Sequence, residues 1–131
     1  MAAVLEHSVD VRWRDVDALG HVNHAVFLTY LEEGRDAFYT WLLGADPSYV
    51  VVRLEVDLRA EVRYPDRQVR VRIEAERLGT TSLTTRETIT TPSGEVAAQA
   101  RVVTVRWDAG LRKPVPFTGA ERARLSGDTP G

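Results

Sequence analysis

Two carboxylates and two of the chain's three histidines lie within one short polar segment, residues 14–24. The carboxylates are Asp15 and Asp17, and the histidines are His21 and His24. A carboxylate beside the start of a helix can act as a base or as a nucleophile, and a histidine four residues later can orient it or carry a proton. Unpaired amides at the same helix start can stabilise a carbonyl oxygen that develops negative charge. The segment is therefore our candidate for a site that acts on a carbonyl group.

The composition restricts which other chemistry the chain can perform. It contains no cysteine, which excludes disulfides, cysteine-bound zinc and thiol nucleophiles. None of its five serines lies in the G-x-S-x-G pattern of serine hydrolases. His21 and His24 have an H-x-x-H spacing that can serve a metal, but a lone pair of histidines in a polar loop is usually not a metal site. We expect no metal and no organic cofactor.

Strands form most of the predicted fold. Residues 7–14 alternate in polarity, with Val9, Val11 and Trp13 on one side, which predicts a half-buried strand just before the candidate segment. Alternation and β-branched residues predict four later strands, at about 49–59, 69–76, 80–91 and 95–107. Because short turns join the last three, we expect an antiparallel meander.

One long helix follows the candidate segment. Apolar residues recur at helical spacing over 25–43, which predicts a single amphipathic helix. We expect Asn23 to cap its start and Gly44 to end it in the left-handed conformation. A short helix over 119–125 is predicted near the end of the chain. The order of strand, long helix and four strands predicts an α+β fold in which one antiparallel sheet curls around one helix.

Length and charge restrict the organisation and the partners. The chain has 131 residues and no change in composition that would mark a linker, which predicts one domain over 1–131 with a core at about 7–120 and a frayed tail at 121–131. The net charge of -2 offers no excess of positive charge for nucleic acid. Because no apolar stretch approaches the roughly 20 residues that span a bilayer, and residues 1–8 do not resemble a signal peptide, we expect no membrane partner and a cytoplasmic location.

The candidate segment also resembles a known family. Residues 15–24, Asp-Val-Asp-Ala-Leu-Gly-His-Val-Asn-His, followed by a helix that contains Tyr30, Glu33 and Arg35, are similar to the signature of hotdog-fold acyl-CoA thioesterases of the 4-hydroxybenzoyl-CoA thioesterase type. The resemblance covers about residues 7–120. It implies the hotdog fold, an antiparallel sheet wrapped around one long central helix, and hydrolysis of an acyl-CoA thioester to a free acid and coenzyme A.

The resemblance implies roles for the residues of the segment. The second aspartate of the pair, Asp17, would attack the thioester carbonyl or activate a water, and a backbone amide near His24 would bind the oxyanion. Related plant thioesterases pair an aspartate and a histidine spaced as Asp17 and His21, but they have an asparagine where this chain has Leu19. The catalytic assignments are therefore Asp17, His21 and His24, while we expect Asp15 to fix the loop by accepting hydrogen bonds from nearby amides.

We assign the substrate-binding residues around this centre. They are Gly20, Asn23, Tyr30 and Glu33. Asn23 is foremost a helix cap, and Tyr30 belongs to the apolar stripe of the helix. Glu33 is included because another branch of hotdog enzymes takes its catalytic carboxylate from this helix.

Other functions remain open at this point. A hotdog hydratase or dehydratase, or a non-catalytic acyl-CoA-binding protein, would have a similar fold. A phosphatase of the D-x-D type would need a parallel α/β core and a later catalytic lysine, whereas Lys113, the single lysine of this chain, lies in the tail region just before Pro114 and Pro116.

A second copy of the chain is an expected partner, beside the acyl-CoA substrate. One helix covers only one face of such a sheet, and the family pairs protomers into a continuous sheet. We expect a homodimer or homotetramer with the site at the interface.

Arginines could also bind the phosphates of coenzyme A, because a guanidinium grips phosphate bidentately. Five of them crowd one stretch: Arg59, Arg63, Arg67, Arg70 and Arg72. Their alternation with apolar residues over 69–73 instead favours a solvated outer face of the sheet.

Overall fold

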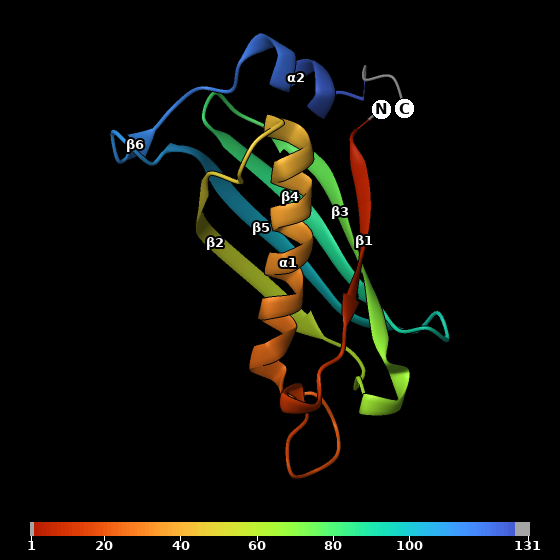
Figure 1. Ribbon diagram of the computed structural model, residues 1–131. Coiled ribbons are helices and arrows are strands. Elements are labelled where there is room, and N and C mark those ends of the chain that lie inside the picture. The colour runs from red at the N-terminus through yellow and green to blue at the C-terminus, as the bar shows by residue number, and fades with distance from the viewer. Residues whose placement is uncertain (1, 128–131) are drawn as a thin grey trace.

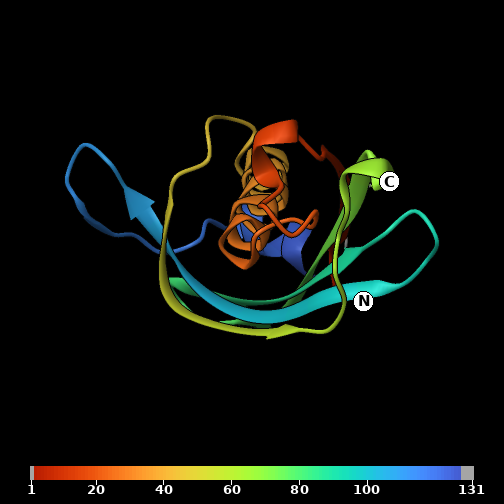
Figure 2. The same cartoon turned by 90° about the horizontal axis from the view of Figure 1, so that it is seen from below.

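A six-stranded sheet curls around helix α1 in the computed structural model, which describes residues 2–127 (Figure 1). The elements in chain order are β1 (Val4–Asp10), η1 (Trp13–Asp15), α1 (His24–Leu43), β2 (Tyr49–Leu58), η2 (Tyr64–Asp66), β3 (Gln68–Leu78), β4 (Ser82–Thr90), β5 (Val96–Asp108), β6 (Lys113–Pro114) and α2 (Gly119–Leu125). Seen along α1, the sheet forms a cup with the helix inside it (Figure 2). This is the predicted α+β hotdog architecture.

The strand order explains the shape of the cup. Strands pair in the order β1-β3-β4-β5-β2, and β6 adds to β5. The meander of β3, β4 and β5 is confirmed, and every strand pair among residues 2–127 is antiparallel. An antiparallel sheet is not the core of a D-x-D phosphatase, so that alternative is excluded. β1 and β2 form the two edges of the main sheet, with α1 between them on the concave side.

Helix α1 matches its predicted ends to within one residue. The side chain of Asn23 accepts a hydrogen bond from the Ala25 N–H, and Gly44 ends the helix with φ of 65°. The aromatic stripe, including Phe27, Tyr30 and Phe38, is buried against the sheet. The sequence therefore specified both ends of the helix through capping chemistry and its buried face through periodicity.

The first strand ends earlier than its pattern predicts. Strand β1 stops at Asp10, and the chain then makes a 3-10 turn in which the Asp15 carboxylate accepts the Arg12 N–H at 2.9 Å. Val11 remains buried, but Trp13 is 77% exposed, so its predicted place on the buried side is wrong. The alternation of apolar and polar residues continues after Asp10, although the backbone leaves the sheet there and enters the 3-10 turn.

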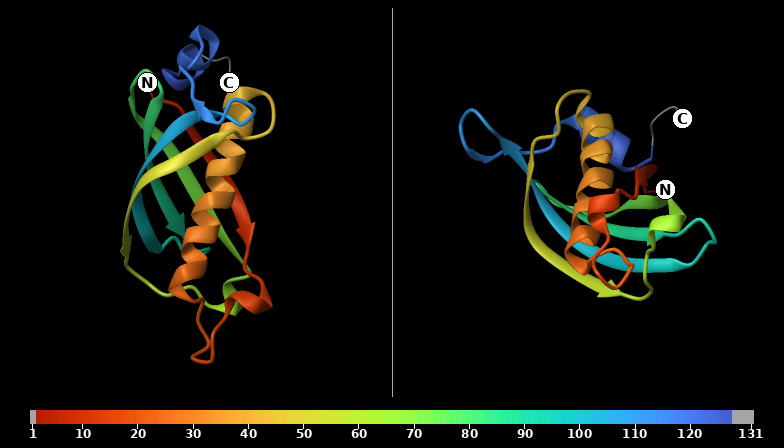
Figure 3. Two further views of the ribbon diagram at one scale, coloured as in Figure 1. Left: turned by 90° about the vertical axis from the view of Figure 1, so that its left-hand side faces the viewer. Right: turned by 60° about the horizontal axis from the view of Figure 1, so that its bottom comes forward.

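Helix α2 covers the end of α1 that lies away from the candidate segment (Figure 3). Arg124 donates a hydrogen bond to the Leu42 carbonyl at 2.9 Å, and Leu125 is buried in the core. Residues 121–125 of the expected tail lie in this helix, and residues 128–131 lie outside the described residues. The single-domain organisation stays a prediction. Neither helix of the described chain is long and apolar enough to cross a membrane.

A buried ion pair joins the middle of α1 to the sheet. Arg35 donates from Nε and Nη2 to the two carboxylate oxygens of Glu87 on β4, at 3.0 and 2.8 Å. The Thr85 hydroxyl donates to the same carboxylate at 2.8 Å. Next to Arg35, Gly34 approaches β3 so closely that an added Cβ would collide with the Val71 side chain. The helix backbone and the sheet are therefore in contact at this point, and the ion pair fixes their relative position.

Replacing Arg35 alone should destabilise the fold strongly. Arg35→Met leaves the Glu87 carboxylate buried without its counter-charge, which should lower the free energy of unfolding by about 3–5 kcal/mol. The double variant Arg35→Met/Glu87→Leu should recover most of this loss, because a buried ion pair is often replaceable by apolar groups of similar size. Arg101→Met, which breaks the exposed pair with Glu76, should cost about 0–1 kcal/mol. Urea denaturation measures all three, and equal losses for Arg35→Met and Arg101→Met would contradict the assignment.

Candidate active site

A tight hairpin displays the candidate residues at the start of α1, at the lower end of the molecule in Figure 1. The N–H of Asp17 donates to the His21 carbonyl at 2.9 Å, and the N–H of Asn23 donates to the Asp15 carbonyl at 3.0 Å. Gly20 closes the turn with φ of 85°, a left-handed conformation that glycine adopts at little cost. The hairpin therefore brings the two ends of the D-x-D-x-x-G-H segment together directly before the helix.

The Asp17 side chain is oriented by its own loop. Its Oδ1 accepts the N–H of Leu19 at 2.9 Å, and its Oδ2 lies 3.4 Å from Nδ1 of His21. The side chains of Asp17 and His21 are 27% and 34% exposed. The structure therefore brings Asp17 and His21 together, with one carboxylate oxygen tied to the loop and the other open toward the imidazole and solvent.

The first turn of α1, which directly follows the hairpin, offers a backbone donor. Asn23 occupies two of the first amides, because its side chain accepts from Ala25 and its carbonyl accepts from Val26. The N–H of His24 has no hydrogen-bond acceptor among residues 2–127. The His24 side chain is exposed and makes no hydrogen bond within the described chain. For His24, the backbone rather than the imidazole is thus the group with a defined place in the site.

Asp15 has a different environment from Asp17. Its Oδ2 accepts hydrogen bonds from the Arg12 N–H at 2.9 Å and from the Tyr30 hydroxyl at 2.7 Å. The expected hydrogen bond from a nearby amide to Asp15 is confirmed. Tyr30 is fully buried, and burial together with the hydrogen bond to Asp15 raises its pKa above the ordinary value. The structure therefore places Tyr30 under the loop, with its hydroxyl already bonded inside the protomer.

Glu33 lies on the same side of α1 as Tyr30, and it also has a partner. Both of its carboxylate oxygens accept from the Arg12 guanidinium, at 2.7 and 2.8 Å. Sequence reasoning missed Arg12, because a charged residue on the polar side of an alternating strand resembles an ordinary surface charge. The only signal for this pair in the sequence was Glu33, an acidic residue on the side of the helix that faces Arg12.

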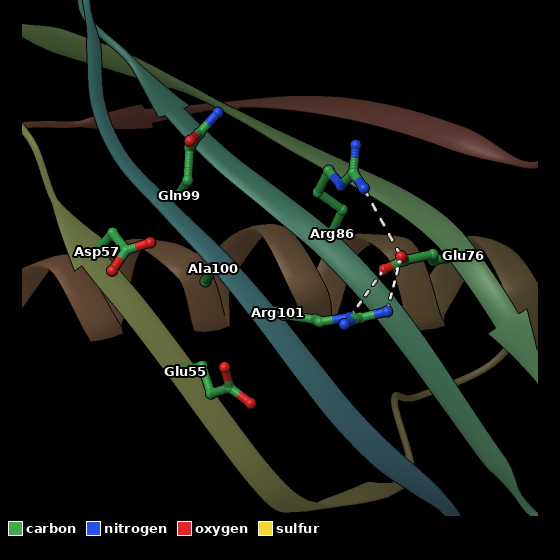
Figure 4. Close-up of a pocket in the computed structure, with 7 residues that line it drawn as sticks. All are labelled: Glu55, Asp57, Glu76, Arg86, Gln99, Ala100 and Arg101. Carbon is green, nitrogen blue, oxygen red and sulfur yellow. Dashed lines mark hydrogen bonds and ion pairs between the residues drawn. The ribbon is translucent and has the colours of Figure 1, made fainter.

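Several arginines of the sheet, among them Arg70, Arg72, Arg86 and Arg101, lie on the face turned away from α1, whereas Arg106 pairs with Glu121 of α2. This face has an open depression of about 460 Å³. Figure 4 shows that the side chains of Arg86 and Arg101, which line it, both approach Glu76. Glu76 reaches both of them, at 3.6 and 2.9 Å. Arg70 and Arg72 are exposed on the same face, as the alternation predicts. This mixture of charges fits a solvated outer face better than a phosphate site.

No group of three or more potential metal ligands gathers anywhere in residues 2–127. The cavity on the outer face is likewise lined by none of the residues of the hairpin. The groups that the candidate site offers for chemistry are the half-exposed carboxylate of Asp17, the imidazole of His21 and the first turn of α1.

The fold and the hairpin together define the class of the protein. A curled antiparallel sheet around one helix is the fold of hotdog thioester hydrolases, and the hairpin places a carboxylate and an imidazole directly before that helix. The model of the thioesterase-like superfamily matches residues 11–125. The chain belongs to the thioesterase-like superfamily and is a thioester hydrolase.

Known relatives agree with this membership over nearly their whole length. The long-chain acyl-CoA thioesterase FadM of Escherichia coli K12 is 27% identical, with 92% of this chain and 96% of that protein covered. A thioesterase from Thermus thermophilus, solved in complex with coenzyme A and Zn, is 37% identical with a TM-score of 0.79, covering 95% of this chain and 98% of that one. A predicted thioesterase from Bacillus stearothermophilus is 27% identical with a TM-score of 0.80, covering 98% and 100%. The resemblance to hotdog thioesterases is confirmed.

The capping role of Asn23 predicts how substitutions of this residue change the stability of the protein. Asn23→Ala removes the acceptor for the Ala25 N–H and should lower the free energy of unfolding by about 1 kcal/mol. Asn23→Asp keeps an acceptor and should retain the stability of the wild type. Thr118→Ala, which removes the corresponding cap of α2, is the matched control and should cost a similar amount. If Asn23→Ala unfolds at the same urea concentration as the wild type, the side chain does not stabilise the helix.

Proposed function

We propose that the protein hydrolyses an acyl-CoA thioester to a free carboxylic acid and coenzyme A, with Asp17 as the reacting carboxylate. The observation that carries this proposal is the placement of Asp17 in a hydrogen-bonded hairpin directly before α1, whose first amide, the N–H of His24, has no acceptor in the described chain. The acyl-CoA substrate is inferred from two relatives, one named a long-chain acyl-CoA thioesterase and one solved with coenzyme A.

In the proposed reaction, Asp17 acts on the thioester carbonyl in one of two ways. In the first, it attacks the carbonyl carbon, the C–S bond breaks with release of the coenzyme A thiolate, and water then hydrolyses the resulting mixed anhydride. In the second, it removes a proton from a water that attacks the carbonyl carbon, and the C–S bond breaks in the same way. In both cases the carbonyl oxygen gains negative charge. The N–H of His24, with the positive partial charge of the first turn behind it, is the proposed donor to that oxygen.

His21 has a supporting role in this proposal. Its Nδ1 lies 3.4 Å from the free oxygen of Asp17, close enough to orient the carboxylate or to pass a proton to the departing thiolate. Gly20 shapes the turn that makes this approach possible, and Asn23 holds the helix start. Glu33 is half-exposed and retains its assignment near the substrate, whereas the hydroxyl of Tyr30 is bonded to Asp15.

We also propose a homodimer or homotetramer, built through strand β2. This edge strand is hydrogen-bonded on one side only, to β5. On its α1 side, Val51, Leu54 and Leu58 are exposed although their partners across the ladder on β5 are buried. A long apolar edge of this kind favours pairing with a second strand. A neighbouring protomer there would add a second wall to the site.

A cytoplasmic location remains a prediction from the sequence.

Replacing the Asp17 carboxylate should abolish turnover without unfolding the protein. Asp17→Asn keeps an acceptor for the Leu19 N–H, so the loop should survive, but kcat should fall by about 10²–10⁴-fold. Asp108→Asn is the control, because Asp108 also accepts a turn amide, from Leu111 at 2.8 Å, but lies outside the site. The assay follows thiol release from a panel of acyl-CoA thioesters.

Thiol release, acyl-CoA binding and enoyl-CoA hydration, measured together, separate the alternatives. Equal rates for the wild type and Asp17→Asn would remove Asp17 from its proposed role. Binding of acyl-CoA by the wild type without thiol release would identify an acyl-CoA-binding protein. Hydration or dehydration of an enoyl-CoA or hydroxyacyl-CoA, without hydrolysis, would identify the hydratase alternative.

Charging the exposed edge should disrupt the proposed dimer. Val52, which is 59% exposed on β2, lies at the irregularity between Val51 and Arg53. Val52→Lys should shift the protein from dimer to monomer in sedimentation, because an edge lysine disfavours strand pairing. Val4→Lys changes an exposed valine on β1, at the opposite edge of the main sheet, and should leave the dimer intact. A wild-type monomer at micromolar concentration would contradict the proposal.

A further inference from the structure

The loop that carries Asp17 is attached to α1 by a buried hydrogen bond that the proposed reaction does not itself use. The Tyr30 hydroxyl donates to Asp15 Oδ2 at 2.7 Å, and both side chains are buried. A hydrogen bond to a carboxylate is stronger than one between neutral groups, and a buried environment strengthens it further. This contact is therefore strong enough to order the backbone to which Asp15 belongs.

Asp15 connects three parts of the site at one point. Its carboxylate also accepts the Arg12 N–H at 2.9 Å, at the turn that follows β1. Its backbone carbonyl accepts the N–H of Asn23, the residue that caps α1, at 3.0 Å. Asp17 lies only two residues further along. A shift of Asp15 would therefore move Asp17 relative to the helix-start amides.

A second contact joins the same two elements closer to solvent. Arg12 and Glu33 form a bidentate pair, but their side chains are 47% and 32% exposed. Exposed ion pairs contribute little, about 0–1 kcal/mol. The Tyr30–Asp15 contact is thus the stronger of the two, and we call it the tyrosine clamp.

We propose that Tyr30 and Asp15 are positioning residues, which hold the Asp17 hairpin in register with the first turn of α1. This inference rests on the proposed function for its effect on rate, but the clamp itself is a property of the fold. It gives Tyr30 a role other than substrate contact. Small displacements of a reacting group lower kcat, whereas the affinity for the distant parts of a substrate is preserved.

Tyr30→Phe tests the clamp, because it removes one hydroxyl and keeps the ring. Tyr39→Phe is the matched control. Tyr39 lies on the same helix, is also fully buried, and shares a hydrogen bond of 2.5 Å with Thr104 on β5, away from the hairpin. Burial raises the pKa of Tyr39 to about 12, so its hydroxyl is likewise protonated at neutral pH. Both variants thus lose one buried hydroxyl of the same helix.

Two measurements are made on each variant. In Tyr30→Phe we expect kcat to fall by about 10- to 100-fold with KM changed less than about twofold, and the amides of residues 16–22 to exchange hydrogen at least about tenfold faster. Tyr39→Phe should leave both unchanged. Asp15→Ala should lower kcat at least as much as Tyr30→Phe, and the double variant should lose no more than Asp15→Ala, because the hydroxyl then has no acceptor to hold.

The outcomes separate the clamp from the proposed function. If the wild type hydrolyses thioesters and Tyr30→Phe matches Tyr39→Phe in kcat, the clamp is overturned and the function stands. If the wild type releases no thiol but loop exchange rises only in Tyr30→Phe, the proposed function is overturned and the clamp stands. Unchanged loop exchange in Tyr30→Phe overturns the clamp whether or not the wild type is active.

Discussion

The contact between the middle of α1 and the sheet determines where every other part of the molecule lies. Apolar burial is not directional, so a stripe of aromatic residues alone would allow the helix to slide or rotate within the cup. The buried pair of Arg35 and Glu87 is directional, with two hydrogen bonds in fixed geometry. Gly34 allows the helix backbone to reach β3 at the same level. Both ends of a nearly rigid helix are thereby placed relative to the strands.

The two ends of α1 then serve different purposes. At the far end, α2 packs over the last turn and accounts for one of its free carbonyls through Arg124. At the near end, the chain arrives from β1, turns, and must present a hairpin at the helix start. Asp15 and Tyr30 connect that hairpin to the helix, so the position set by the ion pair is carried to the candidate site. The first turn of α1 is exposed there at His24 and Ala25, and the His24 N–H has no acceptor among residues 2–127.

Local chemistry made much of this predictable, whereas long-range charge pairing did not. Asn23 and Gly44 predicted the ends of α1, and the alternation of apolar and polar residues predicted the bounds of β3, β4 and β5 to within a few residues. Trp13 was misplaced because the alternating pattern outlasts the strand. Arg35 and Glu87 look like surface charges in sequence, since nothing local indicates that they bury each other. The pairing of β2 with β5 also lies beyond local patterns, because it depends on closure of the whole sheet.

The two aspartates of the motif show how one spacing can yield two functions. They are two residues apart, yet Asp15 points inward to two donors while Asp17 remains partly exposed with one oxygen bound by its own loop. A carboxylate oxygen that already accepts two hydrogen bonds, one of them fully buried, is a poor base and a poor nucleophile, because reaction there would require breaking both. Within the described residues, His21 is the one side chain paired with Asp17 Oδ2. This difference in environment supports the proposals that Asp17 is the reacting carboxylate and that Asp15 positions it.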